Sequence, residues 1–162
     1  MTRVESLCAV IGEEVHVCVV LAAVLRDEQA AVVALRPQAI LSCVEQRQVL
    51  HDALVQLAER RRTLVREEAS TRGSAAVSVT GLLPLLPPDP RARVREGLAA
   101  LRRALLEARS LEHPNERLVS GGLETVDELL RVLRALVPGA RYGADAQLAP
   151  AAAGAERLNR HV

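Results

Sequence analysis

Apolar residues recur at alternating steps of three and four through residues 4–35. In a heptad written abcdefg, the a positions are Val4, Ile11, Cys18, Leu25 and Val32, and the d positions are Leu7, Glu14, Leu21, Glu28 and Leu35. This spacing is typical of a long helix that packs along another helix. Two seam positions are Glu14 and Glu28, which are costly to bury unless water or a partner reaches them. We therefore predict one long helix with two acids in its packing seam.

The pattern breaks at Pro37, and a second heptad runs from there to about residue 68. Proline disfavours helical geometry at the residue before it and suits the first turn of a new helix. The a positions of the second heptad are Ile40, Arg47, Leu54 and Arg61, and the d positions are Cys43, Leu50, Leu57 and Leu64. A second long helix is expected, with two arginines in its seam.

The charges of the two seams predict how the helices pair. If the chain folds back antiparallel about Pro37–Gln38, residues whose numbers sum to 75 lie opposite each other. Glu28 then faces Arg47, and Glu14 faces Arg61. The same register pairs Leu25 with Leu50, Leu21 with Leu54, and Cys18 with Leu57. Both spacings are heptads, so the second charge match follows from the first. We expect a hairpin roughly 45 Å long, from about 30 residues at 1.5 Å each, with ion pairs that fix register rather than add much stability.

Residues 69–88 form the predicted connector to a third helix. Small and polar residues open this segment and prolines close it. Its leucine pairs, at 82–83 and 85–86, are too apolar for a free loop, and we expect them to cap one end of the hairpin. Asp89 followed by Pro90 then has the form of an N-cap with proline at the first helical position.

A third heptad follows and continues almost to residue 137. Its d positions are Leu98, Leu105, Glu112, Val119, Val126 and Leu133, and its a positions are Leu101, Ala108, Asn115, Gly122, Leu129 and Leu136. The register survives Pro114, whose ring should clash with the carbonyl of Ser110. The pattern predicts either one long kinked helix or two nearly collinear helices, ended by Pro138–Gly139.

Composition supports an all-α fold. Hydrophobic residues make up 49% of the 162 residues, yet the chain has no Phe and no Trp. A core of Leu, Val and Ala suits close packing of helix on helix, whereas compact mixed folds use aromatic anchors. We predict an elongated antiparallel helical hairpin plus a third long helix over residues 1–137, followed by a flexible tail over residues 138–162 that contains the single aromatic residue, Tyr142.

Charge and motifs favour a protein that binds over one that catalyses. The net charge is +1, with acidic and basic residues interspersed, and "ERRRTLVRE" fits a solvated helix face. Nucleic-acid binding is not expected from these interspersed charges. Membrane insertion is not expected either, because the run "VHVCVVLAAVL" is too short to span a bilayer. We expect buried thiols in a reducing cytoplasm at Cys8, Cys18 and Cys43. No cofactor is expected, and no phosphate-binding loop or nucleophile elbow is present.

One pair of side chains gives an alternative from another class. Glu13 and His16 have the spacing of a helical di-iron ligand pair, which would suit a metal-dependent helical-bundle enzyme. Such a site needs a second pair and two further carboxylates, and the sequence offers no second copy. A solvated or packed helix face is the simpler interpretation of these two residues.

The heptads and a motif near the end of the third helix resemble the FlgN family of flagellar export chaperones. The segments that carry the resemblance are "LAAVLRDEQAAV", "ILSCVEQRQVLHDALVQLAERRRTLV", "PNERLVSGGLETVDELLRVL" and "RYGADAQ". The resemblance implies a cytoplasmic helical protein that holds the hook-filament junction proteins FlgK and FlgL for the type III export apparatus. It further implies cargo binding by the end of the third helix and docking of the Tyr142 region on the cytosolic domain of the export gate.

The candidate cargo-binding residues are Asn115, Leu118, Val119, Leu123, Val126 and Leu130. These would offer an apolar groove or stripe to an amphipathic segment of the cargo. The alternative is that they face the hairpin, together with Leu133. The heptad assigns Val119, Val126 and Leu133 to the inner seam, so Leu118, Leu123 and Leu130 are the stronger candidates.

Three further alternatives stay open from the sequence. Tyr142 either anchors a partner or packs against the end of the bundle near Leu82–Leu86. The chain is either a junction-protein chaperone or another helical secretion adaptor of the FliT type. Its apolar stripes would also suit a homodimer.

Overall fold

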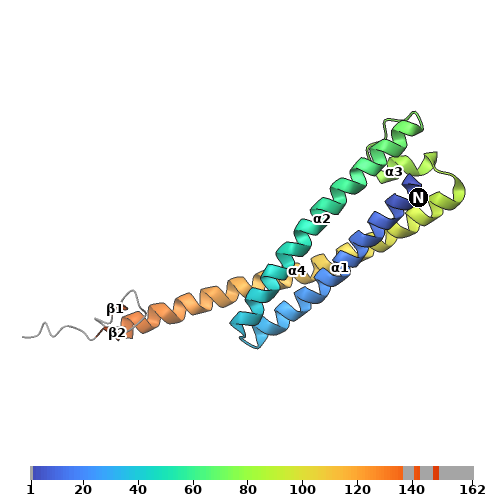
Figure 1. The fold of residues 1–162 in the computed structure, drawn as a ribbon. Helices are drawn as coiled ribbons and strands as arrows, with labels where there is room; N and C mark the ends of the chain where they lie inside the picture. The colour runs from blue at the N-terminus through green and yellow to red at the C-terminus, as the bar shows by residue number, and fades with distance from the viewer. Residues whose placement is uncertain (1, 137–140, 143–147, 150–162) are drawn as a thin grey trace, which may run out of the picture. The chain divides into compact units, whose positions relative to one another are not determined.

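The computed structural model describes residues 2–136, 141–142 and 148–149 of the chain. Four α-helices account for most of these residues, which confirms the predicted all-α class. The elements are α1 (Arg3–Val33), α2 (Pro37–Thr71), α3 (Val79–Leu82), the 3-10 turn η1 (Leu83–Leu85), α4 (Pro88–Leu136), β1 (Arg141–Tyr142) and β2 (Leu148–Ala149) (Figure 1). The chain divides into two compact units, Met1–Val119 and Ser120–Val162.

Local signals at both ends of α1 agree with its boundaries. Thr2 and Glu5 form a capping box, in which the Thr2 hydroxyl accepts from the Glu5 backbone N–H and the Glu5 carboxylate accepts from the Thr2 N–H. The bond from the Thr2 backbone also lowers the pKa of Glu5. At the other end the N–H groups of Leu35 and Arg36 bond back to the carbonyls of Val32 and Ala31, as in a Schellman motif.

Helices α1 and α2 form the predicted hairpin in the predicted register. Arg47 Nη1 lies 3.4 Å from Glu28 Oε2, and Arg61 Nε lies 2.9 Å from Glu14 Oε2. Pro37 begins α2, so the turn also lies where the sequence places it. The two acids are buried, and each has the arginine partner that its position in the seam requires.

The first part of α4 packs against α1 and runs parallel to it. Three contacts fix this direction, since Gly97 lies against Ile11, Glu107 pairs with Arg26, and Asn115 bonds to the carbonyl of Leu25. The main core of the first unit gathers side chains from all three long helices and from α3. Its buried members are Val4, Leu7, Ile11, Cys18, Val65, Ala69, Val79, Leu82, Leu86, Val94, Leu101 and Ala104.

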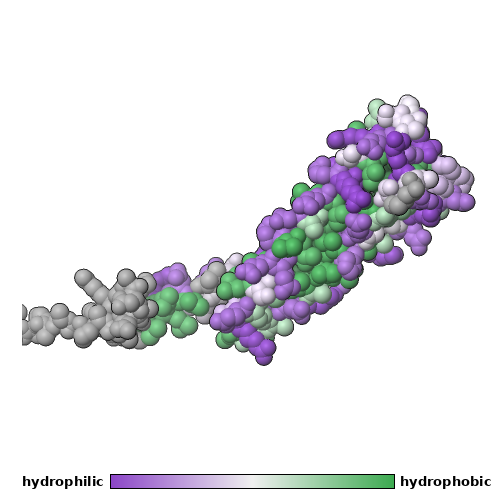
Figure 2. Space-filling model, viewed as in Figure 1, coloured by the Kyte–Doolittle hydropathy of each residue, from purple (hydrophilic) through white to green (hydrophobic). Residues whose placement is uncertain are grey.

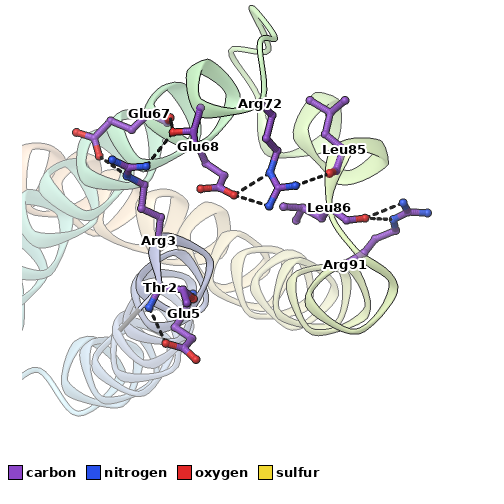
Figure 3. A network of polar contacts seen from close by, with 10 residues as sticks. Thr2, Arg3, Glu5, Glu67, Glu68, Arg72, Leu85, Leu86 and Arg91 are labelled. Carbon is purple, nitrogen blue, oxygen red and sulfur yellow. Dashed lines mark hydrogen bonds and ion pairs between the residues drawn. The ribbon is translucent and has the colours of Figure 1, made fainter.

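The connector closes one end of this core, as expected. Leu82 and Leu86 are fully buried, whereas Leu85 faces solvent. Two arginines hold the backbone of this segment, because Arg72 donates to the carbonyl of Leu85 and Arg91 donates to the carbonyl of Leu86 (Figure 3). Leu82 and Leu86 therefore cover this end of the core, and the two arginines satisfy the backbone carbonyls of the segment.

Helix α4 differs from the prediction at its start. It begins at Pro88, so Asp89 lies in the first turn and is not the N-cap. The carbonyl of Pro87 already accepts from Arg91, and Pro88 suits the first helical position because it needs no backbone donor there. Asp89 still benefits from the positive end of the helix dipole.

Pro114 lies inside α4 without splitting it. The structure keeps a single helix of 49 residues, so the one-helix alternative is the correct one. A proline at this position removes one backbone hydrogen bond and kinks the helix. Helix α1 has only 31 residues, which means that α4 is much longer than the helix against which it packs.

The second unit contains the rest of α4 and a short strand pair. Arg141 pairs with Ala149 and Tyr142 with Leu148, in antiparallel register. These two-residue strands were not predicted. The predicted helix end at Pro138–Gly139 and the domain boundary after residue 137 lie outside the described residues, as does most of the predicted flexible tail.

Helix α1 is long and apolar enough to cross a membrane by length and composition, with a mean hydropathy of 2.1 over an 18-residue window. The unbroken apolar run "VHVCVVLAAVL" within this helix is shorter than that window. Within the structure, 44% of that window is buried. The helix also carries the buried, arginine-paired Glu14 and Glu28, so in this structure it serves as the core helix of the first unit.

Candidate binding surface

The part of α4 in the second unit carries an exposed apolar stripe, formed by Val126, Leu129, Leu130 and Leu133. These residues are spaced by three, one and three, so they lie on one face of the helix. Their exposed fractions run from 38% for Leu130 to 57% for Leu129. The intervening positions are the polar residues Asp127, Glu128 and Arg131 and the 45% exposed Val132. A contiguous apolar face of this kind is typical of a helix that awaits a partner.

The expectation that Val126 and Leu133 face the inner seam is wrong, because they are 53% and 54% exposed. The heptad itself is correct, and its earlier members Leu101 and Ala108 are buried. Leu101 and Ala108 belong to the first unit, whereas Val126 and Leu133 belong to the second unit and have exposed side chains.

The six predicted cargo-binding residues have different surroundings. Val126 and Leu130 belong to the exposed stripe, Leu118 is 38% exposed, and Val119 is half-buried in the first unit. The side chain of Leu123 lies outside the described part of the chain. Asn115, in contrast, is only 1% exposed. In this conformation a partner has access to the apolar candidates and not to the asparagine.

Asn115 lies in a polar layer with Glu28 and Arg47. Its Nδ2 donates to the backbone carbonyl of Leu25 at 2.6 Å and to Glu28 Oε2 at 3.3 Å. Arg47 Nη1 approaches the same carboxylate oxygen at 3.4 Å. Each of the three side chains comes from a different long helix, so the layer joins α1, α2 and α4. Sequence reasoning found the Glu28–Arg47 pair and missed the third member.

The other seam acid, Glu14, has one arginine partner. Arg61 Nε donates to Glu14 Oε1 at 3.0 Å. Burial raises the pKa of the Glu14 carboxyl, and the charge of Arg61 offsets this effect only in part. The pair is thus a register contact that carries a cost of desolvation.

A shallow groove on the hairpin was not anticipated. It has a volume of about 300 Å³ and lies between α1 and α2, lined by Val20, Val24, Glu45, Gln46, Val49 and Leu50. Figure 2 shows hydrophobic side chains gathered on this face of the hairpin. The available signal was the number of apolar residues beside the seams, such as Val20 and Val49, which exceeds what two-helix packing needs.

The three cysteines are free thiols. Cys18 and Cys43 are buried, as expected, whereas Cys8 is only partly buried. Burial raises the pKa of all three thiols. A raised pKa leaves less thiolate at neutral pH, so these residues behave as packing side chains.

The metal-site alternative finds no support in the geometry. Glu13 pairs with Arg60 at 3.6 Å, and His16 is exposed. Within the residues that the structure describes, no group of three or more His, Cys, Asp or Glu side chains is placed to hold a metal ion.

The region around Tyr142 is described only in its backbone. Tyr142 lies in β1 opposite Leu148. Its side chain is outside the described part, so its predicted docking role stays a prediction.

The geometry is that of a helical binding protein, with a well-packed first unit and an exposed apolar stripe on the continuing helix. A family model described as FlgN protein matches residues 1–150. The chain therefore belongs to the FlgN family, whose members are flagellar export chaperones, and the resemblance seen in the sequence is confirmed. No curated protein and no solved structure gives a significant match.

Proposed function

We propose that this chaperone acts by binding in the cytoplasm, with the hook-filament junction proteins FlgK and FlgL as its cargo. The observation that supports it best is the stripe of Val126, Leu129, Leu130 and Leu133, whose members are all at least 38% exposed. An amphipathic helix of the cargo would bury this surface and keep its own apolar face from aggregating. Binding without chemistry is consistent with a chaperone family and needs no cofactor.

The proposed contact surface combines the stripe with the family-derived candidates. Leu118, Val119, Leu123, Val126 and Leu130 would touch cargo directly. The half-buried Val119 would contribute less than its exposed neighbours. Asn115 would act from inside the first unit, because its side chain is buried.

Delivery to the export gate is the second part of the proposal. The aromatic ring of Tyr142 would supply a large anchor with a hydroxyl on the gate's cytosolic domain. Its support is the family resemblance of "RYGADAQ" together with the absence of any other aromatic residue in the sequence.

The test is co-purification of the chain with the C-terminal regions of FlgK and FlgL from its own organism. Wild type is compared with a truncation after Val137. A soluble complex that survives truncation supports cargo binding on α4 and leaves Tyr142 free for the gate. Loss of the complex on truncation would move the cargo site beyond residue 137. No complex with wild type would refute the FlgK and FlgL assignment, and filament-cap protein in a parallel arm would test a FliT-like cargo.

The residues are tested by the triple variant Leu118→Ala, Leu123→Ala and Leu130→Ala. Truncation of central apolar contacts typically costs about 1–2 kcal/mol each, so cargo affinity should fall by roughly 100-fold or more. The matched control is Leu106→Ala, because Leu106 is 57% exposed on the same helix but lies outside the proposed contact surface. Unchanged affinity in the triple variant would remove these residues from the cargo site.

Two cheap measurements address the remaining alternatives. Metal analysis of the purified chain tests the bundle-enzyme alternative, since a stoichiometric, tightly held metal would overturn a purely binding role. Sedimentation of the cargo-free chain tests for a homodimer.

A further inference from the structure

One layer of polar side chains interrupts the apolar seams of the first unit. Glu28 occupies a d position of α1, Arg47 an a position of α2, and Asn115 an a position of α4. Glu28 Oε2 is shared by the other two, at 3.4 Å from Arg47 Nη1 and 3.3 Å from Asn115 Nδ2. All three seams therefore become polar at the same level of the bundle.

This polar layer makes the first unit less stable than an apolar layer at the same level would. Asn115 is 1% exposed, and its Oδ1 has no hydrogen-bond partner. The orientation of the amide is forced, because both neighbouring groups, the Leu25 carbonyl and the Glu28 carboxylate, are acceptors. An unpartnered buried carbonyl is costly, and an apolar side chain in a helical seam is usually at least as stable.

The heptad pattern alone leaves the position of α4 along the hairpin open. Its seam continues past Asn115 through Val119, Gly122 and Val126, and a shift by one heptad would bring these residues to the hairpin while moving Asn115 to the level of Ala108, away from Glu28. Residues 72–87 would span roughly 50 Å if extended, so connector length does not fix the register either. After such a shift Gly122 would face the Glu28–Arg47 pair and could offer it no side-chain donor.

We propose that Asn115 is a positioning residue that locks α4 in one register against the hairpin. A single buried asparagine at an a position is known to select register in coiled coils at a cost in stability. Here it does so by matching the level of the Glu28–Arg47 ion pair, since the other seam pair, Glu14–Arg61, lies two heptads away along α1. A consequence, which rests on the proposed function, is that the exposed stripe of Val126, Leu129, Leu130 and Leu133 stays available for cargo.

The lock is tested by a distance measured in the full-length chain without cargo. Cys8, Cys18 and Cys43 are replaced by Ala, and spin labels are attached at Glu45→Cys on α2 and Arg95→Cys on α4, two exposed sites. Electron–electron double resonance then reports one distance for the chain that keeps Asn115. In Asn115→Leu, a second population is expected, displaced by about 10 Å, the rise of one heptad, with an unchanged or higher thermal midpoint.

Two controls separate a register lock from ordinary packing. Leu101→Ala in the same seam should lower the thermal midpoint and keep the single distance. Glu28→Gln, which retains an acceptor for the Asn115 amide, should also keep it. The proposal is overturned if Asn115→Leu shows only the original distance. It is equally overturned if that variant fails to fold, because the layer would then be needed for stability. Cargo is absent, so the outcome does not depend on the FlgK and FlgL assignment.

Discussion

Two stretches of α4 carry the same heptad and have opposite surroundings. In residues 88–119 the a and d positions face the hairpin, with Leu101 and Ala108 buried. In residues 120–136 the equivalent positions Val126, Leu129 and Leu133 are more than half exposed. The contrast teaches that a heptad defines which face of a helix is apolar. It does not say whether the covering partner belongs to the same chain.

The largest expected effect comes from two leucines at equivalent a positions. Leu101→Ala removes a 6% exposed side chain and should lower the free energy of unfolding by about 2–4 kcal/mol. Leu129→Ala removes a 57% exposed one and should change it by no more than about 0.5 kcal/mol. Urea unfolding of both variants provides the measurement. Equal losses would mean that residues 120–136 are covered in solution, by a second copy or by the chain itself.

Glycine-to-alanine changes sharpen the same contrast. At Gly97 an added Cβ would lie 3.0 Å from Ile11 Cγ2, so Gly97→Ala should destabilise by about 1–2 kcal/mol through overpacking. At Gly121 an added Cβ would meet nothing within 4 Å, so Gly121→Ala should stabilise the helix by up to about 1 kcal/mol. Thermal unfolding distinguishes the two signs. A neutral Gly97→Ala would show that Ile11 moves far enough for the gain in helix propensity to offset the close contact.

A smaller expected effect is the pH dependence of stability that the buried Glu14 contributes to the first unit. Burial raises the pKa of Glu14 above its ordinary value of 4.5, so the folded protein holds this proton to higher pH than the unfolded chain does. The contribution of Glu14 to stability is therefore present below pH 4.5, and it is lost as the pH rises from there through the raised pKa that Glu14 has in the folded protein. In Glu14→Gln this dependence is absent.

The thermal midpoint of Glu14→Gln, relative to wild type, should accordingly rise between pH 4 and pH 7, the span chosen to bracket that ordinary value of 4.5. The exposed Glu13→Gln, which keeps Glu14, serves as the control for the loss of one carboxylate from α1. A relative midpoint that falls with pH would mean that the Arg61 ion pair outweighs the burial of Glu14.

Sequence reasoning succeeded where the interactions are periodic and local. Pro37 marks the hairpin turn, and complementary charges at heptad positions set its register, so Glu28–Arg47 and Glu14–Arg61 were predictable. The predicted start of α4, at Pro90, was two residues too late, because Pro88 and Pro90 both satisfy the preference for proline in a first turn. The strands β1 and β2 were missed, since two-residue pairs leave almost no periodic signal.

The candidate site was predictable only in part. The apolar residues near the end of the third helix were named, but the heptad assigned Val126 and Leu133 to the inside. Asn115 was named as a contact and lies buried, because its surroundings depend on Leu25 and Glu28, about ninety residues earlier in the chain. Separations of this kind leave no trace in a local pattern.

By itself, the sequence determined the three long helices, the apolar face of each one and the pairing of α1 with α2, because short-range periodicity and charge are enough to specify them. Only the tertiary structure decided that α4 runs parallel to α1, that Asn115 completes the Glu28–Arg47 layer, and that the stripe from Val126 to Leu133 is exposed. The first two features depend on packing between residues far apart in the chain. The third depends on whether another element covers the apolar face, which the heptad does not specify.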